Sequence, residues 1–240
     1  ESLYILAQEP PLALRRIKLS LQYITKLAAS PSKPAYNTVF HPNFTQLYEA
    51  KPNSIPPLSL RMKPYLTAAG VDVTMVAEIE TSPIPPWLLL TPVINMESAD
   101  MKKSQTNPLQ YQEIFNNIKC RYQDHKFLYT DGSKDGSRTA YAVTSCNKNY
   151  VSERIPDVSS IYTAELTAIY KALQLILNSE LQKFVVCSDS KSTLQALENK
   201  LIDNPIVLDV MITYANIAEH KEVLFCWVPS HIDIKGNEKA

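Results

Sequence analysis

Glycine is scarce in this sequence and proline is abundant. The 240 residues contain four glycines and 17 prolines, and all but three of the prolines lie before residue 109. Frequent proline interrupts long helices and central strands. From Phe127 onward the composition is that of an ordinary folded domain. We therefore expect the two halves of the chain to differ in kind.

Cysteine pairs and long apolar runs are also lacking. Cys120, Cys146, Cys187 and Cys226 include no pair at zinc-ligand spacing and do not form the dense framework of a small secreted protein. Apolar runs such as residues 87–90 are far too short to span a bilayer, and no signal-peptide pattern opens the sequence. We expect reduced thiols in a soluble intracellular protein without a membrane partner. The sequence does not distinguish nucleus from cytoplasm.

Acidic residues are almost absent from one stretch, although the net charge of the chain is zero. Between positions 15 and 63 the only acidic residue is Glu49, and it accompanies Arg15, Arg16, Lys18, Lys26, Lys33, Lys51, Arg61 and Lys63. Such a stretch can attract phosphate, and a solvated helix face explains it equally well.

Residues 1–30 predict one amphipathic helix. Its apolar positions step by three or four residues and end near Ser30: Leu14, Ile17, Leu21, Ile24 and Ala28. We interpret it as a structural helix that packs against other elements rather than as a membrane-binding one.

Residues 31–121 are predicted to form a proline-rich connector. We expect it to be mostly extended, with short strands around 71–79 and a weak helical pattern over 108–119. Its proline density leaves few elements that could bury a face, so we expect no independent hydrophobic core over 31–108.

Residues 122–240 predict an α/β domain with a mixed five-stranded sheet and flanking helices. Asp131–Ser133 and Asp135–Gly136 have the composition of turns, and Ser160 can cap a helix. Strands are expected over 126–130, 139–146, 150–155, 184–187 and 222–228, and helices over 160–178, 190–198 and 206–218, with a further helix beginning at the C-terminus.

Three acidic residues are the candidates for chemistry. Asp131 is expected to end the first strand, Glu165 to lie among apolar residues of the long helix, and Asp189 to end the buried fourth strand. Each has another explanation: a turn for Asp131, contact with solvent or a lysine for Glu165, and a helix cap for Asp189.

The three carboxylates become informative together. If the first and fourth strands are neighbours, Asp131 and Asp189 share one end of the sheet, and the long helix can aim Glu165 at the same place. Carboxylates so close repel one another unless a cation neutralises them, and oxygen ligands suit Mg²⁺ or Mn²⁺. Two such ions about 4 Å apart can promote a phosphodiester displacement.

Four short motifs resemble, in order and spacing, the signature blocks of the type I ribonuclease H family. They are Tyr-Thr-Asp-Gly-Ser at 129–133, Thr-Ala-Glu-Leu at 163–166, Ser-Asp-Ser at 188–190, and Val-Pro-Ser-His with Gly-Asn-Glu-Lys-Ala within 228–240. The resemblance implies a ribonuclease H-like fold and cleavage of the RNA strand of RNA–DNA hybrids with two Mg²⁺ ions, Mn²⁺ being an alternative. It also implies a fourth metal-binding aspartate just after Ala240, so the domain is expected to be truncated within its C-terminal helix.

The same resemblance implies roles for individual residues. Asp131, Glu165 and Asp189 would be catalytic metal ligands, and His231 would be a catalytic histidine that assists proton transfer or product release. Candidate contacts with the hybrid are Gly132, Ser133, Ser190 and Asn237, of which Gly132 and Ser133 would let the backbone approach the nucleic acid.

The N-terminal half resembles the connector that follows the reverse transcriptase in arthropod-type, jockey-like non-LTR retrotransposon polyproteins. The similar segments are residues 10–16, 34–36 and 85–87. This resemblance implies a role in retrotransposon replication, with a reverse transcriptase domain of the same polyprotein as a partner. Two alternatives stay open: a catalytically impaired, nucleic-acid-binding relic of the same fold, and another nuclease or an integrase of that fold.

Overall fold

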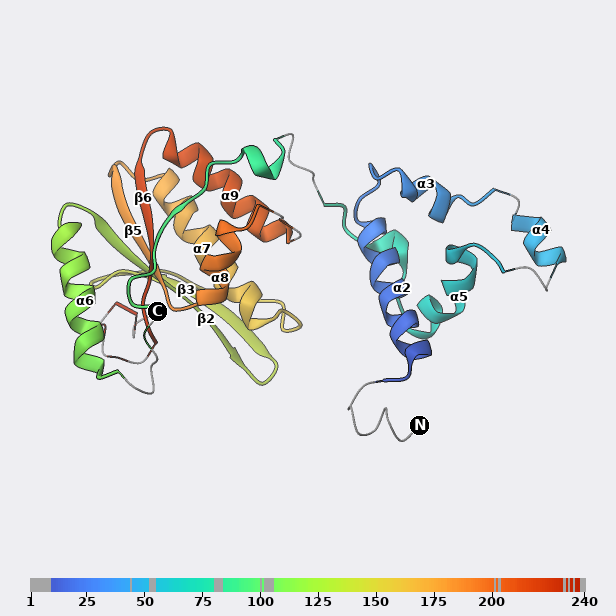
Figure 1. Cartoon of the computed structure of the whole chain (residues 1–240), viewed down its shortest axis with the longest axis horizontal. Coiled ribbons are helices and arrows are strands. Elements are labelled where there is room, and N and C mark those ends of the chain that lie inside the picture. Colours follow the sequence, from blue (N-terminus) through green and yellow to red (C-terminus); the bar gives the residue numbers. More distant parts are fainter. Residues whose placement is uncertain are drawn as a thin grey trace. The chain divides into compact units, whose positions relative to one another are not determined.

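The chain folds into two compact units, Glu1–Thr81 and Ser82–Ala240. Figure 1 shows a computed structural model. The structure describes residues 10–43, 45–51, 55–79, 84–99, 101, 106–200, 202, 204–230, 232, 234 and 236–237. No helix among these residues is both long enough and apolar enough to cross a membrane. All four cysteines are free thiols, and Cys187 and Cys226 are buried.

The first unit is helical. Its elements are α2 (Leu12–Ala28), α3 (Ala35–Phe40), α4 (Thr45–Ala50), α5 (Leu58–Ala68) and the 3-10 turn η1 (Val73–Met75). Helix α2 packs against α3, α5 and η1. Its buried residues are Ile24, Leu27 and Ala28, so the predicted packing of this helix against other elements is confirmed for its C-terminal half, whereas Leu14 of the predicted apolar face is exposed.

The prediction that the segment after α2 is extended is wrong. Helices α3 and α5 are preceded by Pro34 and Pro57. Proline is favourable at the start of a helix because the first N–H groups have no partner within the helix and the ring already fixes a helical φ. The expected strands at 71–79 are replaced by η1. Among the described residues of 31–79 only Met62 is a buried apolar side chain, so the core of this unit depends on α2.

The second unit contains a mixed sheet of six strands in the order β1-β6-β5-β2-β3-β4. The strands are β1 (Val93–Asn95), β2 (Lys126–Asp135), β3 (Arg138–Thr144), β4 (Asn149–Ile155), β5 (Lys183–Ser188) and β6 (Glu222–Trp227). Strands β2, β3 and β4 are antiparallel, whereas β1, β6, β5 and β2 run parallel. The expected five-strand sheet is thus extended by β1, which lies in the predicted connector.

Helices cover both faces of this sheet (Figure 1). On one face lie α7 (Ile161–Leu177), α8 (Lys191–Glu198) and α9 (Pro205–Ala218), and on the other lies α6 (Pro108–Arg121). Successive residues of a strand point to opposite faces. Leu128, Val186 and Phe225 accordingly belong to the core under α7 and α9, whereas their neighbours Tyr129 and Val185 pack with α6.

Helix α6 therefore belongs to the same compact unit as the sheet. Its buried residues Tyr111, Phe115 and Ile118 fill the second core cluster. The structure places the division of the chain at Thr81 and Ser82, whereas we expected divisions after residues 30 and 121. Residues 82–121 are part of the layered unit rather than a connector to it.

The remaining elements agree with prediction except at β2. Ser160 caps α7, because its Oγ accepts a hydrogen bond from the Thr163 N–H at 3.1 Å. Strand β2 runs to Asp135, so the expected end of the strand at Thr130 and the expected turn at Asp131 are wrong. The other predicted turn, at Asp135–Gly136, is confirmed, and the φ of 55° at Gly136 favours glycine. The predicted C-terminal helix lies outside the described residues.

Candidate active site

Asp131 and Asp189 meet because two parallel strands are paired in register. Thr130 of β2 lies opposite Ser188, the last residue of β5. The next residue along each of these two strands is an aspartate, Asp131 after Thr130 and Asp189 after Ser188. The Thr130 Oγ1 also donates a hydrogen bond of 3.1 Å to the Cys187 carbonyl. Asp131 is therefore inside β2 but at the point where the pairing with β5 stops, which is why the two side chains share one end of the sheet.

Glu165 reaches the same place because α7 lies against β2 at Gly132. A Cβ atom at Gly132 would be 2.6 Å from the Glu165 nitrogen and 2.9 Å from the Ala164 Cβ. No larger residue fits without moving the helix. The Gly132 N–H also donates a hydrogen bond to the Glu165 carboxylate. Gly132 thus allows β2 and α7 to lie this close together.

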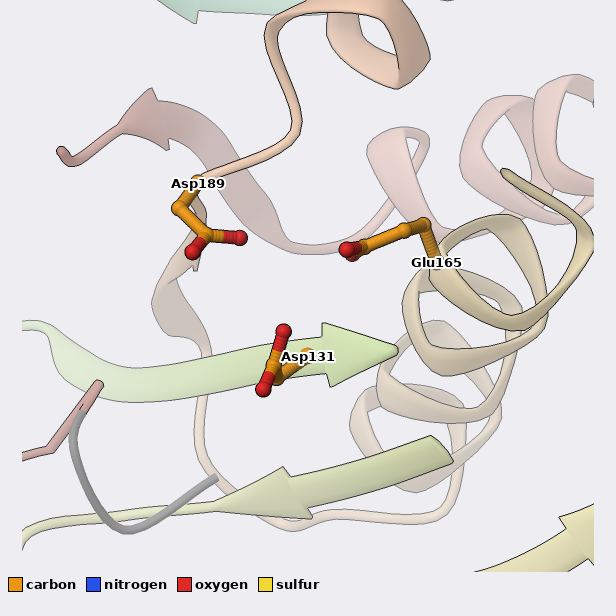
Figure 2. A group of neighbouring side chains, drawn as sticks. All are labelled: Asp131, Glu165 and Asp189. Atoms are coloured by element: carbon orange, nitrogen blue, oxygen red, sulfur yellow. The ribbon is translucent and has the colours of Figure 1, made fainter. Parts of the chain in front are cut away.

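The three carboxylates converge, as predicted (Figure 2). An oxygen from each of Asp131, Glu165 and Asp189 lies within 4.8 Å of the others. Glu165 is 7% exposed, and its Oε2 is buried without a hydrogen-bond partner among the described residues. The cluster thus brings acceptor oxygens from three separate elements together at one end of the sheet.

Burial and like charge raise the pKa of Glu165 to about 8. Burial is the larger cause, and the negative charges of Asp189 and Asp131 add to it, whereas the hydrogen bond from Gly132 opposes it. Clustered oxygen ligands and an orphaned buried carboxylate oxygen fit a hard divalent cation such as Mg²⁺ or Mn²⁺. A cation at this position would stabilise the ionised form of Glu165.

The backbone around Asp189 is held by the neighbouring strand. The Trp227 Nε1 donates a hydrogen bond of 3.0 Å to the Asp189 carbonyl, and the Val228 N–H donates one of 3.0 Å to the Ser188 carbonyl. Trp227 was not among the predicted site residues. The available signal was a tryptophan at the end of β6, next to a strand that is directly followed by Asp189.

The predicted substrate-contact residues lie in different surroundings. Ser133 is exposed on β2. Ser190 is half-buried, and its Oγ lies 2.6 Å from the Thr193 Oγ1. Gly132 is buried, and contact with α7 leaves no room for a side chain at this position. The roles of these residues in binding stay predictions.

The described residues that follow β6 pack on the face of the sheet that α6 covers, where Val228, Ile232 and Ile234 belong to the second core cluster. Gly236 lies on Tyr129, since a Cβ atom there would be 2.0 Å from the ring, and its carbonyl accepts a hydrogen bond of 3.1 Å from the Thr144 Oγ1. Asn237 is 8% exposed, and its Oδ1 is buried without a partner among the described residues. His231 lies outside the described residues, so its predicted role stays a prediction.

A mixed sheet with helices on both faces and three carboxylates at one end defines an α/β domain with a site that could hold a metal ion. The family model described as RNase H matches residues 123–240, which include all three carboxylates and strands β2–β6. The match supports a ribonuclease H domain in this part of the chain, and the observed fold is consistent with it. No curated protein matches the sequence at a significant level.

Proposed function

We propose that this chain is a metal-dependent endonuclease that cleaves the RNA strand of RNA–DNA hybrids. The observation that supports this most is the convergence of Asp131, Glu165 and Asp189 within 4.8 Å, inside a region that matches the RNase H family. A structural role for three clustered carboxylates is costly, because like charges repel in a partly buried site. A role in holding divalent cations removes that cost.

Each residue has a defined task in this proposal. Asp131, Glu165 and Asp189 hold two Mg²⁺ ions, or Mn²⁺ in their place. When bound, the ions supply charge stabilisation at the attacking and leaving oxygens of the phosphodiester. Glu165 must give up its proton to act as a ligand, and Gly132 keeps it oriented through the backbone hydrogen bond. His231 assists proton transfer or product release.

Recognition of the hybrid is proposed to depend on its shape and on the 2′-hydroxyl groups rather than on base sequence. Ser133, Ser190 and Asn237 are the proposed contacts, together with the backbone at Gly132. Ser133 is exposed and Ser190 directly follows Asp189, which places both beside the carboxylates in the chain.

We further propose that the protein acts inside the cell in retrotransposon replication, with a reverse transcriptase domain of the same polyprotein as its partner. The support is the resemblance of residues 10–16, 34–36 and 85–87 to the connector of such polyproteins.

Cleavage of a labelled RNA–DNA hybrid tests the proposed activity. In Mg²⁺ the chain should cut only the RNA strand and leave 3′-hydroxyl and 5′-phosphate ends, and EDTA should stop the reaction. Asp189→Asn should lose this activity, whereas Asp157→Asn, an exposed residue paired with Arg154, should retain it. Binding of hybrid without cleavage in either Mg²⁺ or Mn²⁺ would instead favour the alternative of a catalytically impaired relic.

A further inference from the structure

The first unit presents cationic side chains on both of its longer helices. Lys18 and Lys26 on α2 and Lys63 on α5 are exposed, as are Arg16 and Arg61. Glu49 is the only acidic residue between positions 10 and 71 of the sequence. Local charge of one sign over this length raises the concentration of polyanions near the surface.

Arg16 and Arg61 line one cavity between α2 and α5. A cavity of about 360 Å³ between α2 and α5 is lined by Arg16 and Arg61, by the apolar residues Ile17, Leu58 and Met62, and by Tyr65. Tyr65 is 44% exposed, so its ring and hydroxyl are accessible. We call this cavity the α2–α5 groove. Arginine and tyrosine side chains are among the usual donors to phosphate oxygens, and arginine can form two parallel hydrogen bonds to one phosphate.

The apolar side chains that line the groove are largely covered. Met62 is buried, and Ile17 and Leu58 are half-buried. Leu12, Leu14 and Leu19 of α2 are exposed but do not line the groove. A helix that lies in a membrane surface must bury an apolar face in lipid. The groove itself therefore offers arginine charge with little exposed apolar surface, which favours a soluble polyanion over a membrane.

We propose that the α2–α5 groove binds the phosphate backbone of a nucleic acid, with Arg16 and Arg61 as the phosphate contacts. The groove, with a volume of about 360 Å³, is large enough for one phosphate and its sugar. It would therefore contact the backbone of one strand at the surface of an RNA–DNA hybrid. The inference rests on the proposed function only for the choice of this polyanion, since the groove lies outside the candidate active site.

A second contact of this kind has a clear consequence for the whole chain. Because both units belong to one polypeptide, a hybrid held by one unit is presented to the other at a raised effective concentration. The groove should therefore tighten binding without changing the chemistry. Its loss should appear in the affinity and in the salt dependence of binding, and not in cleavage at saturating hybrid.

The test compares two double variants of the full chain that change net charge equally. Arg16→Glu/Arg61→Glu alters the groove, and Lys33→Glu/Lys51→Glu alters exposed lysines of the same unit that do not line it. Affinity for an RNA–DNA hybrid is measured by fluorescence anisotropy in EDTA over a series of salt concentrations. An Arg16→Gln/Arg61→Gln variant, with circular dichroism and thermal melting of each protein, separates lost contacts from lost folding.

Arg16→Glu/Arg61→Glu should weaken binding of the hybrid about tenfold and reduce the slope of log K for binding against log salt concentration by about 2. Lys33→Glu/Lys51→Glu should have a smaller effect on both quantities. Arg16→Gln/Arg61→Gln should also lose affinity for the hybrid, but less than Arg16→Glu/Arg61→Glu does. Equal effects of Arg16→Glu/Arg61→Glu and Lys33→Glu/Lys51→Glu would overturn the proposal. It would also be overturned if the protein bound phosphatidylserine vesicles more tightly than hybrid and lost this binding in Arg16→Glu/Arg61→Glu. A wild-type chain that binds hybrid through the groove but never cleaves it would reject the proposed enzyme and leave this inference standing.

Discussion

The two units of this chain differ in whether a side chain caps the start of their helices, although proline also begins α6 and α9 of the second unit. In the second unit, α6, α7 and α9 start with a polar side chain that accepts a backbone N–H: Asn107, Ser160 and Asn204. In the first unit, α2, α3 and α5 follow Pro11, Pro34 and Pro57, and none has a side-chain cap. Both devices suit the first turn, where N–H groups lack partners within the helix. Dense proline can therefore mark a series of helix starts rather than an extended chain.

The units also differ in how much apolar surface they bury. The second unit has core clusters on both faces of its sheet, with residues such as Ile169 and Leu173 fully buried. The buried apolar residues described in the first unit are Ile24, Leu27, Ala28, Ala29 and Met62. Since burial of apolar surface is the main source of stability, we expect the layered unit to be the more stable one and to hold the rigid site.

The largest expected effect concerns where the chemistry lies. Asp131→Asn should reduce hybrid cleavage by more than about 100-fold, because even outer-shell changes at metal sites cost 10- to 100-fold. Met75→Ala, an 81% exposed residue of the first unit, should leave cleavage unchanged. Single-turnover rates in Mg²⁺ measure both. Cleavage that survives Asp131→Asn would break the assignment of catalysis to the second unit.

The next effect tests whether the two cores are separate. Leu173→Ala should lower the free energy of unfolding of the second unit by about 2–5 kcal/mol, whereas Leu177→Ala, half-exposed in the same helix, should change it by less than about 1 kcal/mol. Leu27→Ala should leave this transition unchanged. Urea unfolding followed by tryptophan fluorescence reports on it, since Trp87 and Trp227 both lie in the second unit. A shift caused by Leu27→Ala would show that the units unfold together.

A smaller effect should appear with pH when divalent ions are absent. The folded pKa of Glu165, about 8, is above its ordinary value of 4.5, so the folded state holds the proton more tightly. The contribution of Glu165 to the free energy of unfolding is complete below about pH 4.5 and is lost as the pH rises towards 8. The size of the loss is set by linkage from the difference between these two pKa values, and the loss should be absent in Glu165→Gln.

Unfolding in EDTA at several pH values, with wild type and Glu165→Gln compared at each, measures this difference. Adding Mg²⁺ should remove it for the wild type, because a bound cation stabilises ionised Glu165. Parallel pH profiles for the two proteins would contradict the raised pKa.

The smallest effect concerns the helix caps. Ser160→Ala should destabilise the second unit by about 1 kcal/mol, because the Thr163 N–H loses its acceptor. Ser152→Ala, exposed on β4, is the matched control and should lie within about 0.5 kcal/mol of wild type. Thermal melting measures both, and equal melting temperatures would show that the cap contributes nothing.

Prediction succeeded where local pattern and tertiary packing agree. Helix α7 carries an unbroken apolar face behind the Ser160 cap, and β5 is a continuous apolar run, so both could be identified from the sequence. The acidic cluster followed from them, since parallel pairing of β2 with β5 brings Asp131 and Asp189 together.

Prediction failed where structure depends on distant partners. Strand β1 is three residues long, too short for an alternation to be visible, and exists because it pairs with β6. Strand β2 continues through Gly132 to Asp135 because β3 pairs with it over that length. Turn-forming residues are therefore tolerated inside a strand when a neighbour satisfies its backbone.

Direct observation of Mn²⁺ tests the central claim that the three carboxylates form a metal site. Crystals of the chain soaked in Mn²⁺ should show anomalous scattering at Asp131, Glu165 and Asp189, and this signal should disappear in Glu165→Gln. No manganese at these carboxylates, in a protein that cleaves RNA–DNA hybrid in the same Mn²⁺ solution, would contradict the claim.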